Sequence, residues 1–343
     1  MKEMLYGKTP AELREVAAGL GMPRHAAGQM AAWLYRRGAV DIAAMTDISA
    51  AHRTALAERF EIGLTPPVRE TVSADGTRKY LFEAAGGAAI EAAMIPDDGR
   101  ERETKRATLC LSSQAGCRMG CVFCATGRQG LLRSLTAGGI LNQFASLPER
   151  DALTNIVYMG MGEPLDNPDE VLKSLDILTS EWGYGWSPTR ITLSTAGVAP
   201  AMERFLRESR VHLAVSLHNP FHDERAAIMP VERAWPIEGI VGTLRRYPLE
   251  PQRRISFEYI VMSGLNDSPR HVAGLVKLLG GLSCRLNLIR FHTIPGSPFF
   301  SPPADAMERL RDNLTRRGIR TTVRASRGED IEAACGLLST RNR

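Results

Sequence analysis

Hydrophobic and polar positions follow a helical period in the first sixty residues. Thr9-Pro10-Ala11-Glu12 combines a capping box with proline at the first helical position, which predicts a helix from there to about Gly21. Apolar residues at helical spacing predict a second helix over about 24–37 and a third over about 50–60. We therefore expect a helical module over residues 1–62.

Beyond Pro66-Pro67 the period becomes that of strands. Residues 68–72 and 79–82 flank Asp75-Gly76, a dipeptide typical of hairpin turns, and a further strand is expected over 89–95. These patterns predict a small β-rich connector over residues 63–104.

From about residue 105, short apolar runs alternate with helical patterns. The runs predict strands over 108–111, 155–159, 190–194, 211–217, 255–261 and 286–291, and the spaces hold helical patterns such as 137–146, 168–179 and 269–279. Six βα units in series predict an α/β fold with a parallel sheet, most simply a partial (βα)6 barrel over residues 105–318. Such barrels carry their chemistry at the carboxyl ends of the strands. Residues 319–343 are expected to add a last strand and a short helix over 328–334.

The composition narrows the class of protein. At 343 residues and 44% hydrophobic content, the chain is about two average domains long and is expected to bury a sizeable core. It shows no long apolar run and no signal-peptide core, so we expect a soluble cytoplasmic protein without membrane contact. The net charge of +5 is compatible with RNA binding and equally with an ordinary arginine-rich chain.

Clustered cysteines are the strongest chemical feature. Cys117, Cys121 and Cys124 form a C-x3-C-x2-C pattern directly after the first expected barrel strand. In a chain without an export signal, such clusters favour metal or redox chemistry over structural disulfides. Three thiolates on one loop suit three irons of a [4Fe–4S] cluster and leave the fourth iron open. The alternative is a zinc site with Cys110 as fourth ligand, although structural zinc sites usually use two cysteine pairs and no second pair exists here.

This cysteine loop resembles that of the radical S-adenosylmethionine (SAM) superfamily. Further segments occur in one order and resemble the RlmN/Cfr family, in particular the RlmN-type 23S rRNA/tRNA adenine carbon-2 methyltransferases. These segments are Thr108–Gln114, Ala125–Gly127, Met159–Leu165, Ser216–His218 and Arg327–Gly336. The resemblance covers nearly the whole chain, including the helical N-terminus.

The resemblance implies which residues hold the cofactors. Cys117, Cys121 and Cys124 would hold the [4Fe–4S] cluster. The SAM contacts would be Gly162, Glu163, Ser194, Ser216, Leu217, His218 and His292. Taken alone, Gly-x-Gly-Glu is also typical of a tight turn, and a lone histidine such as His218 is more often structural. The family usually has asparagine where His292 stands, so that position departs from the family pattern.

The resemblance also implies a reaction, because carbon 2 of adenine is electrophilic and does not displace a methyl group from a sulfonium. Cys335 would take a methyl group from one SAM, and a second SAM would be cleaved to a 5′-deoxyadenosyl radical that removes a hydrogen from the S-methyl group. The resulting methylene radical would add to carbon 2. Glu91 would accept the ring proton, and Cys110 would attack the Cys335 sulfur, leaving a disulfide.

Each of these residues also has a plainer interpretation. Cys110 and Cys335 would then be inert core thiols, as Cys284 is expected to be, and Glu91 would belong to the polar face of its strand. Cys335 precedes Gly336 at the expected end of a helix, a position that favours a mobile segment. Arg324 and Arg327 are expected to favour its thiolate, to contact phosphate or simply to lie on a solvated face.

The implied partners are 23S rRNA, tRNA and a flavodoxin- or ferredoxin-type electron donor, with the chain acting as a monomer. The helical N-terminal module would grip the RNA. Candidate phosphate contacts, each also readable as a plain surface charge, are Arg36, Arg37, Lys105, Arg106, Arg128, Arg133, Arg316 and Arg317.

Two alternatives to carbon-2 methylation stay open. One is Cfr-like methylation of carbon 8 of the same adenosine, although Pro164 after Glu163 fits RlmN-type sequences better than Cfr-type ones. The other is an iron–sulfur RNA-binding protein without catalytic activity.

Overall fold

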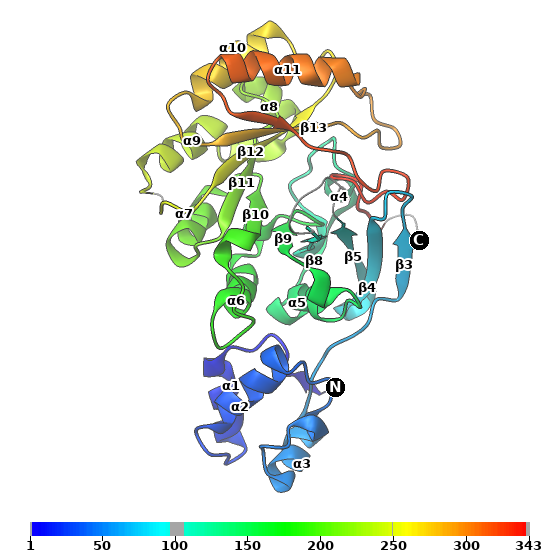
Figure 1. Cartoon of the computed structure of the whole chain (residues 1–343), viewed down its shortest axis with the longest axis vertical. Helices are drawn as coiled ribbons and strands as arrows, with labels where there is room; N and C mark the ends of the chain where they lie inside the picture. Colours follow the sequence, from blue (N-terminus) through cyan, green and yellow to red (C-terminus); the bar gives the residue numbers. More distant parts are fainter. Residues whose placement is uncertain (1, 97–105, 249, 341–343) are drawn as a thin grey trace.

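The computed structural model describes residues 2–96, 106–248 and 250–340. Lys105, one of the predicted phosphate contacts, lies outside this range. Figure 1 shows a small helical module, which contains the N-terminus, beside a larger α/β body. None of the described helices combines the length and the apolar character that a membrane crossing requires.

The N-terminal helices form where the sequence predicts them. The capping box is present, since Thr9 Oγ1 accepts a hydrogen bond from Glu12 N at 3.3 Å and Glu12 Oε2 accepts one from Thr9 N at 2.7 Å. The second helix ends in a π-helical turn, η1. A short parallel pair of strands that the sequence pattern did not predict, β1 and β2, joins the two ends of the module. The elements are β1 (Glu3–Met4), α1 (Pro10–Gly19), α2 (Ala26–Ala31), η1 (Ala32–Arg36), η2 (Ile42–Ala44), α3 (Ala50–Arg59) and β2 (Phe60–Glu61).

The β-rich connector forms an antiparallel meander, as its alternating pattern predicts. It consists of β3 (Arg69–Val72), β4 (Arg78–Ala84), the short turn η3 (Ala85–Gly87) and β5 (Ala88–Ile95). The meander continues into the barrel sheet, because β5 pairs with β6 and sets Ala93 opposite Cys110. One ten-stranded sheet therefore runs in the order β14-β13-β12-β11-β10-β9-β6-β5-β4-β3.

The parallel part of this sheet is the predicted partial barrel. Its strands are β6 (Thr108–Cys110), β9 (Asn155–Tyr158), β10 (Ile191–Thr195), β11 (His212–Ser216), β12 (Ile255–Val261), β13 (Arg285–Arg290) and β14 (Thr321–Val323). The longer helices are α5 (Ala137–Ala145), α6 (Pro168–Thr179), α7 (Ala199–Glu208), α9 (Ile237–Arg246), α10 (Pro269–Leu279) and α11 (Ala304–Arg316). The short ones are α4 (Ala125–Gln129), η4 (Arg150–Ala152), η5 (Pro164–Asp166), η6 (Pro188–Arg190), α8 (His222–Ile228) and η7 (Pro230–Arg233). Most apolar residues of these strands and helices belong to one large core, and two smaller clusters lie beside the cysteine loop and around Cys110.

Two parts of the body differ from the sequence expectation. An antiparallel ribbon, β7 (Gln114–Cys117) with β8 (Gly130–Ser134), was not predicted. The prediction of a helix over residues 328–334 is wrong. That segment forms turns, and Glu332 adopts a left-handed backbone conformation with a φ of 54°. Asp330 accepts hydrogen bonds there from the Ser73 hydroxyl and the Ala74 backbone, at 2.6 and 3.1 Å. These tertiary contacts to the β3–β4 turn replace the bonds of a helix.

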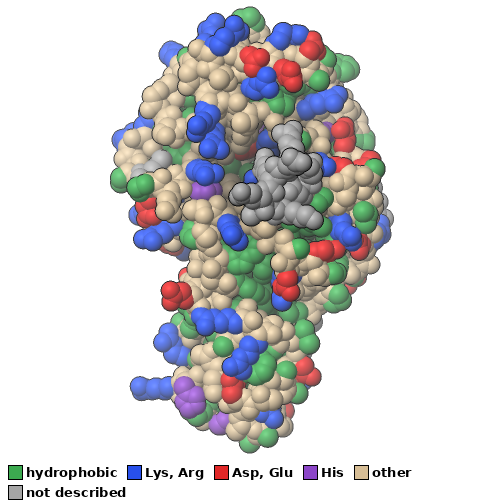
Figure 2. All heavy atoms as spheres, viewed as in Figure 1, with side chains coloured by type: hydrophobic (Ala, Val, Ile, Leu, Met, Phe, Trp, Pro, Cys, Tyr) green, Lys and Arg blue, Asp and Glu red, His purple; other side chains and the backbone are tan. Residues whose placement is uncertain are grey.

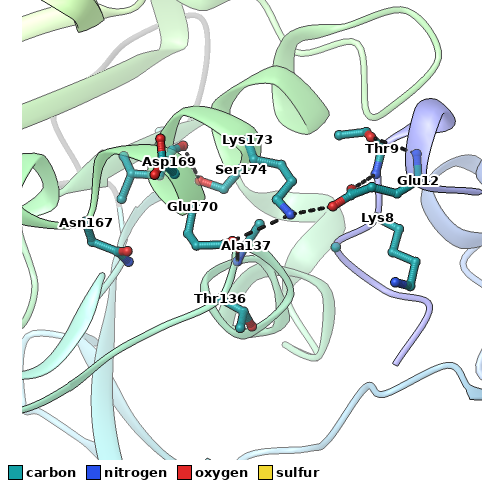
Figure 3. Close-up of polar contacts among 12 residues, drawn as sticks. Lys8, Thr9, Glu12, Thr136, Ala137, Asn167, Asp169, Glu170, Lys173 and Ser174 are labelled. Atoms are coloured by element: carbon teal, nitrogen blue, oxygen red, sulfur yellow. Dashed lines mark hydrogen bonds and ion pairs between the residues drawn. The ribbon is translucent and has the colours of Figure 1, made fainter. Parts of the chain in front are cut away.

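The N-terminal module packs against helices of the barrel through a chain of polar contacts (Figure 3). Lys173 Nζ on α6 donates to Glu12 Oε1 on α1 at 2.8 Å and lies 3.6 Å from Glu170 Oε1. Glu170 Oε2 in turn accepts a hydrogen bond from Ala137 N, at the start of α5, at 2.6 Å. Nearby, the hydroxyl oxygens of Tyr6 and Tyr184 are 2.5 Å apart. The module is therefore held in a defined position below the barrel.

Candidate active site

The three clustered cysteines lie on the loop between the two ribbon strands. Cys117 ends β7, and Cys124 immediately precedes α4. The turn between them needs a glycine, since Gly120 has a φ of +67°. The pKa of the Cys117 thiol is raised to about 12, mainly by burial and to a smaller extent by Glu163 and Cys124. Burial also raises the pKa of the Cys121 thiol, with smaller contributions from Cys124 and Cys117. The three sulfurs thus face one small region.

Three thiols on one loop are the ligands that an iron–sulfur cluster uses, each binding a different iron. Among the residues that the structure describes, no three His, Cys, Asp or Glu side chains are arranged as ligands of a single metal ion. The raised pKa values keep these thiols protonated in the absence of a metal, and metal ligation would supply the positive charge that deprotonates them.

The C-terminal segment is fixed beside this loop by α4. Ala125 N donates to Gly336 O at 2.8 Å, Thr126 Oγ1 donates to Leu338 O at 2.5 Å, and Gln129 Nε2 donates to Thr340 Oγ1 at 2.7 Å. Because α4 begins directly after Cys124, these bonds hold Cys335 next to the cysteine loop. Cys335 indeed packs in the same apolar cluster as Cys121 and Cys124.

Cys110 and Cys335 line one cavity. It has a volume of about 770 Å³, and Cys124 lines it as well. The pKa of the Cys110 thiol is raised to about 12, mainly by burial and next by the Cys335 thiol, while Arg324 opposes the shift. Cys284 is not among the residues that line this cavity. The structure therefore brings together the two sulfurs that the sequence analysis singled out and leaves the sixth cysteine elsewhere.

Glu91 lies behind the Cys335 segment. Its side chain is buried, and Glu91 Oε2 accepts a hydrogen bond from Ser339 N at 3.0 Å while Oε1 lies 3.3 Å from Lys79 Nζ. It is on the same face of β5 as Ala93, which packs against Cys110. Glu91 itself is not among the residues that line the cavity. The carboxylate is near the cysteine pair but occupied by protein partners.

The Gly160–Glu163 segment packs closely against the residues after β6. A Cβ built on Gly160 would lie 2.7 Å from Leu111 O, and one on Gly162, with φ of +100°, would lie 2.5 Å from the Gln114 side chain. The buried Glu163 carboxylate accepts hydrogen bonds from Thr195 Oγ1 at 2.7 Å, Ala196 N at 2.7 Å and Leu165 N at 2.9 Å. Burial raises the pKa of Glu163 to about 7.

Three hydrogen bonds leave the Glu163 carboxylate room for one more donor, because two oxygens offer about four acceptor sites. An ammonium group is a donor of that kind. Gly160 and Gly162 are required by close packing against Leu111 and Gln114. Their presence is therefore no evidence for a bound ligand.

The remaining predicted SAM contacts lie at the ends of β10 and β11. Ser194 and Ser216 are partly exposed, and Leu217 is fully buried. His218 has a φ of 56°, its Nδ1 accepts a hydrogen bond from Ile260 N at 2.9 Å, and its ring meets Phe123 edge-on at 4.8 Å. Burial lowers the pKa of His218 to about 3, so the ring is neutral. Since Phe123 lies inside the cysteine loop, His218 supports that loop by contact.

Sequence reasoning missed the buried ion pair that organises these strand ends. Arg225 is fully buried and pairs with the buried Glu232. Its guanidinium also donates to Leu217 O at 2.9 Å, Ser216 O at 2.7 Å and Ala196 O at 2.9 Å. The pattern gave no signal, because an arginine in a short charged helix is usually exposed. A buried Arg of this kind fixes three backbone carbonyls at once.

His292 lines the cavity as a buried residue, and its Nδ1 lies 3.4 Å from Glu329 Oε1. Across the cavity, the buried Glu258 carboxylate accepts from Asn287 Nδ2 at 2.8 Å and from Arg324 Nη1 at 3.3 Å. The sequence analysis did not predict this network of Glu258, Asn287 and Arg324. Its signal is a charged residue within the mostly apolar strand β12.

The predicted phosphate contacts fall into different surroundings. Arg36 lines a groove beside the N-terminal module, and Arg106 lines the cavity. Arg37 pairs with Asp47, at 3.1 Å, and Arg128 Nη1 donates to Pro295 O at 2.8 Å. Arg133 is exposed on β8, and Arg316 and Arg317 lie exposed at the end of α11. The structure does not gather these residues in one place.

Comparison with known proteins agrees with this geometry. Residues 111–276 match the Radical SAM superfamily, and residues 4–62 match the Ribosomal RNA large subunit methyltransferase N-terminal domain. A protein of Bacteroides fragilis named "Probable dual-specificity RNA methyltransferase RlmN" is 54% identical over 99% of this chain and 97% of its own length. The chain belongs to the RlmN family of radical SAM methyltransferases.

Other members of the RlmN family match over almost as much of the chain. "Dual-specificity RNA methyltransferase RlmN" of Syntrophotalea carbinolica is 44% identical over 96% of this chain and 88% of its own length. A crystal structure of a radical SAM methyltransferase from Sphaerobacter thermophilus superposes with a TM-score of 0.89 at 42% identity, covering 98% of this chain and 99% of that one. Membership of the radical SAM superfamily implies SAM and a [4Fe–4S] cluster as cofactors.

Proposed function

We propose that this protein methylates carbon 2 of an adenosine in 23S rRNA, in the peptidyl-transferase loop, and of an adenosine in the tRNA anticodon loop. The methyl group passes through S-methylcysteine at Cys335 and a covalent Cys335–RNA intermediate that Cys110 resolves. Two SAM molecules are consumed in each turnover. The names of the RlmN relatives as RNA methyltransferases support the substrate class.

One observation carries the proposal. The Cys110 and Cys335 thiols line the same cavity, close enough for Cys335 to raise the pKa of Cys110, and Cys124 of the cysteine loop lines it too. A plain methyltransferase needs no such pair of thiols. A protein that binds RNA through an iron–sulfur cluster without catalysis gives no reason for both to reach one cavity.

Cys117, Cys121 and Cys124 would hold the cluster, and the Gly162–Glu163 segment with Ser194, Ser216, Leu217, His218 and His292 would surround SAM. When bound, cluster and SAM supply the 5′-deoxyadenosyl radical that starts hydrogen abstraction. A small flavodoxin- or ferredoxin-type protein would provide the electron. Glu163 contributes one free acceptor site, and the buried Arg225 keeps the carbonyl groups of Ser216 and Leu217 oriented.

The cysteines of the chain do the covalent work. The Cys335 sulfur carries the methyl carbon to the base and stays bonded to it until the ring proton leaves. The adduct loses one electron to the cluster, and its ring proton passes to the base. The Cys110 thiolate then attacks the Cys335 sulfur, the carbon–sulfur bond breaks with its electron pair on the methylene carbon, and that carbon takes up a proton to become the methyl group. A Cys110–Cys335 disulfide remains, which a thiol reductant must reduce before the next turnover. Burial keeps Cys110 protonated, with its pKa at about 12, so it does not react before the intermediate forms.

Glu91 is the proposed acceptor of the ring proton. It lies beside the Cys335 segment, on the face of β5 that also carries Ala93 against Cys110. Its hydrogen bond from Ser339 N must lengthen before the carboxylate reaches the base. A shift of the Cys335 segment on RNA binding would free Glu91 and deliver the sulfur at the same time.

The test is the identity of the product. Reconstituted protein would be incubated anaerobically with SAM, a reductant and either a 23S rRNA fragment or a tRNA anticodon stem-loop from cells that lack the activity. Digestion to nucleosides, chromatography and mass spectrometry should reveal 2-methyladenosine, and peptide analysis should place a methyl group on Cys335. Cys335→Ala should abolish the product, whereas Cys284→Ala, which alters a cysteine outside the cavity, should leave it unchanged.

Each other outcome corrects a defined part of the proposal. Formation of 8-methyladenosine would assign the protein to Cfr-like chemistry. A methyl group on another cysteine would overturn the role of Cys335. Absence of both 5′-deoxyadenosine and methylated RNA would leave an RNA-binding iron–sulfur protein.

A further inference from the structure

Basic residues lie at the N-terminal ends of the parallel strands. Arg254 and Arg320 directly precede β12 and β14, and Arg285 is the first residue of β13. Arg190 directly precedes β10, and His212 begins β11. Because parallel strands begin at the same end of a barrel, these five residues share one end, here called the arginine floor. It is the end opposite to the one at which the cysteine pair lies.

Within the described part of the chain, no carboxylate pairs with the cations of the arginine floor. Among the described residues, no carboxylate lies within ion-pair distance of Arg190, Arg254, Arg285 or Arg320. Burial lowers the pKa of Arg285, and the charges of Arg254 and Arg320 lower it further. The buried His212 is affected similarly, by burial and then by Arg254, and its Nε2 has no hydrogen-bond partner in the described part of the chain. Such repulsion is relieved when an anion binds.

The cavity connects the arginine floor to the cysteine pair. Its lining includes Arg190, His212, Arg254 and Arg285 at one end and Cys110 and Cys335 at the other. On β13, Arg285, Asn287 and Ile289 all line the cavity, so its wall spans about 13 Å at the usual rise of a strand. The one carboxylate among the described lining residues is Glu258, which Asn287 and Arg324 already bind.

The arginine floor also continues toward the N-terminal module. Arg190 lines a second groove, of about 770 Å³, together with Arg36, Arg150 and the partly exposed Trp186. Two carboxylates, Asp151 and Glu181, lie in this groove as well, so its charge is mixed. Figure 2 shows basic side chains spread along the face of the molecule in view, from the N-terminal module to the barrel. A strand of nucleic acid suits this arrangement of cations and an aromatic ring.

We propose that the RNA strand lies across the arginine floor. Its target base enters the barrel at this end, where the N-terminal ends of the parallel strands lie. Arg254, Arg285 and Arg320 bind the phosphates that flank the target nucleotide, and Arg190 guides the strand from the groove beside the N-terminal module. SAM and RNA then approach the cysteine pair from opposite ends of the barrel. This inference rests on the proposed function, since it takes RNA as the substrate.

Removal of two floor cations tests the inference. Binding of an anticodon stem-loop would be measured by fluorescence anisotropy across a salt series, and KM and kcat would be measured for methylation. We expect Arg254→Ala/Arg285→Ala to raise Kd and KM at least tenfold with kcat changed less than threefold. The slope of log K against log salt should become shallower by about 1.4, because each phosphate contact on a single strand contributes about 0.7.

Two further variants separate charge from folding. Arg254→Lys/Arg285→Lys keeps both cations and should restore most of the affinity. Arg309→Ala/Arg311→Ala removes two arginines from the exposed side of α11, where each pairs with a carboxylate of its own helix, and should leave Kd and slope within twofold of the parent. An unchanged Kd and salt slope in Arg254→Ala/Arg285→Ala, with normal thermal stability, would overturn the inference.

The outcomes also separate this inference from the proposed function. If the parent methylates RNA while Arg254→Ala/Arg285→Ala binds it normally, only the entry route is wrong. If the parent yields no methylated adenosine, the proposed function fails, and the anisotropy data still decide whether the arginine floor binds RNA.

Discussion

At the residue scale, the site depends on side chains whose charge state is set by burial. The Cys110 thiol and the His218 imidazole both lie in the protein interior, and in both cases burial is the largest cause of the pKa shift and favours the neutral form. A neutral His218 accepts the hydrogen bond from Ile260 N and packs on Phe123 of the cysteine loop. Protonation of this ring would therefore loosen the loop.

The pH dependence of stability checks this reading of His218. Its pKa is lowered to about 3 in the folded protein, against 6.5 for an ordinary histidine, so its contribution is complete above pH 6.5 and is lost as pH falls toward 3. Below pH 6.5 the parent should lose about 1.4 kcal/mol per pH unit more than His218→Asn. Asparagine tolerates the left-handed backbone of this position.

Anaerobic thermal melts of parent and His218→Asn between pH 7.5 and 5 would measure the difference. The two curves should converge as the pH falls. Curves that stay parallel over this range would mean that position 218 is not a buried neutral histidine.

The cysteine loop gives a second prediction at this scale. Cys117→Ala removes one of three proposed cluster ligands, so iron bound after anaerobic reconstitution should fall from about four per chain to less than one. Cys284→Ala is the matched control, because it removes a cysteine outside the loop, and it should bind iron like the parent. Metal analysis of anaerobically purified protein is the readout, and stoichiometric zinc in the parent would contradict the cluster.

At the scale of elements, the module, the ribbon and the C-terminal segment meet through short contacts that place the cysteines. The capping box and the helices of the first sixty residues were predictable, because their signals are local in sequence. The apolar runs of the barrel strands were predictable for the same reason. The β7–β8 ribbon was not, since Gln114–Cys117 is short, fully buried and shows no alternation.

The turns around Cys335 were unpredictable for a different reason. A helical pattern is present over residues 328–334, yet Asp330 and Gly328 meet the β3–β4 turn, which lies far away in sequence. The position of Cys335 likewise depends on hydrogen bonds from α4 to residues 336–340. The secondary-structure propensity of a segment contains no information on contacts with residues far away in sequence. The resemblance to the RlmN/Cfr family, by contrast, did point to Cys110 and Cys335.

Docking of the N-terminal module gives a prediction at this scale. Gly7 has a φ of +92°, and a Cβ built on it would lie 2.3 Å from the backbone nitrogen of Gly138 on α5. Gly7→Ala should therefore destabilise the protein by about 2 kcal/mol or more, through backbone strain and the displaced contact. Gly28→Ala, in α2 with no atom within 4 Å of its Cβ, should be neutral or stabilising by about 0.5–1 kcal/mol.

Thermal melts of both variants give the stability change, and anisotropy with RNA gives its consequence for binding. If the module grips RNA, Gly7→Ala should weaken binding more than Gly28→Ala does. Equal stability of the two variants would show that the module does not pack on α5 as described.

At the scale of the whole molecule, one ten-stranded sheet runs through the body, and the helical module lies below it, beneath α5 and α6 (Figure 1). Residues 319–340 return to the barrel and place Cys335 beside Cys110 of the first parallel strand. The cavity that they line extends to the arginine floor. In the function proposed above, both ends of the barrel serve one reaction. The central claim is that these two cysteines, distant in sequence, act on one RNA base in succession.

The most direct measurement is the fate of the RNA in Cys110→Ala. Protein produced in cells, or incubated with SAM, reductant and RNA, would be digested with protease and nuclease and examined by mass spectrometry. The account predicts an adenosine joined through one carbon to the Cys335 sulfur, because no thiol remains to release it. Free methylated adenosine at the parent's rate, with no such adduct, would contradict it.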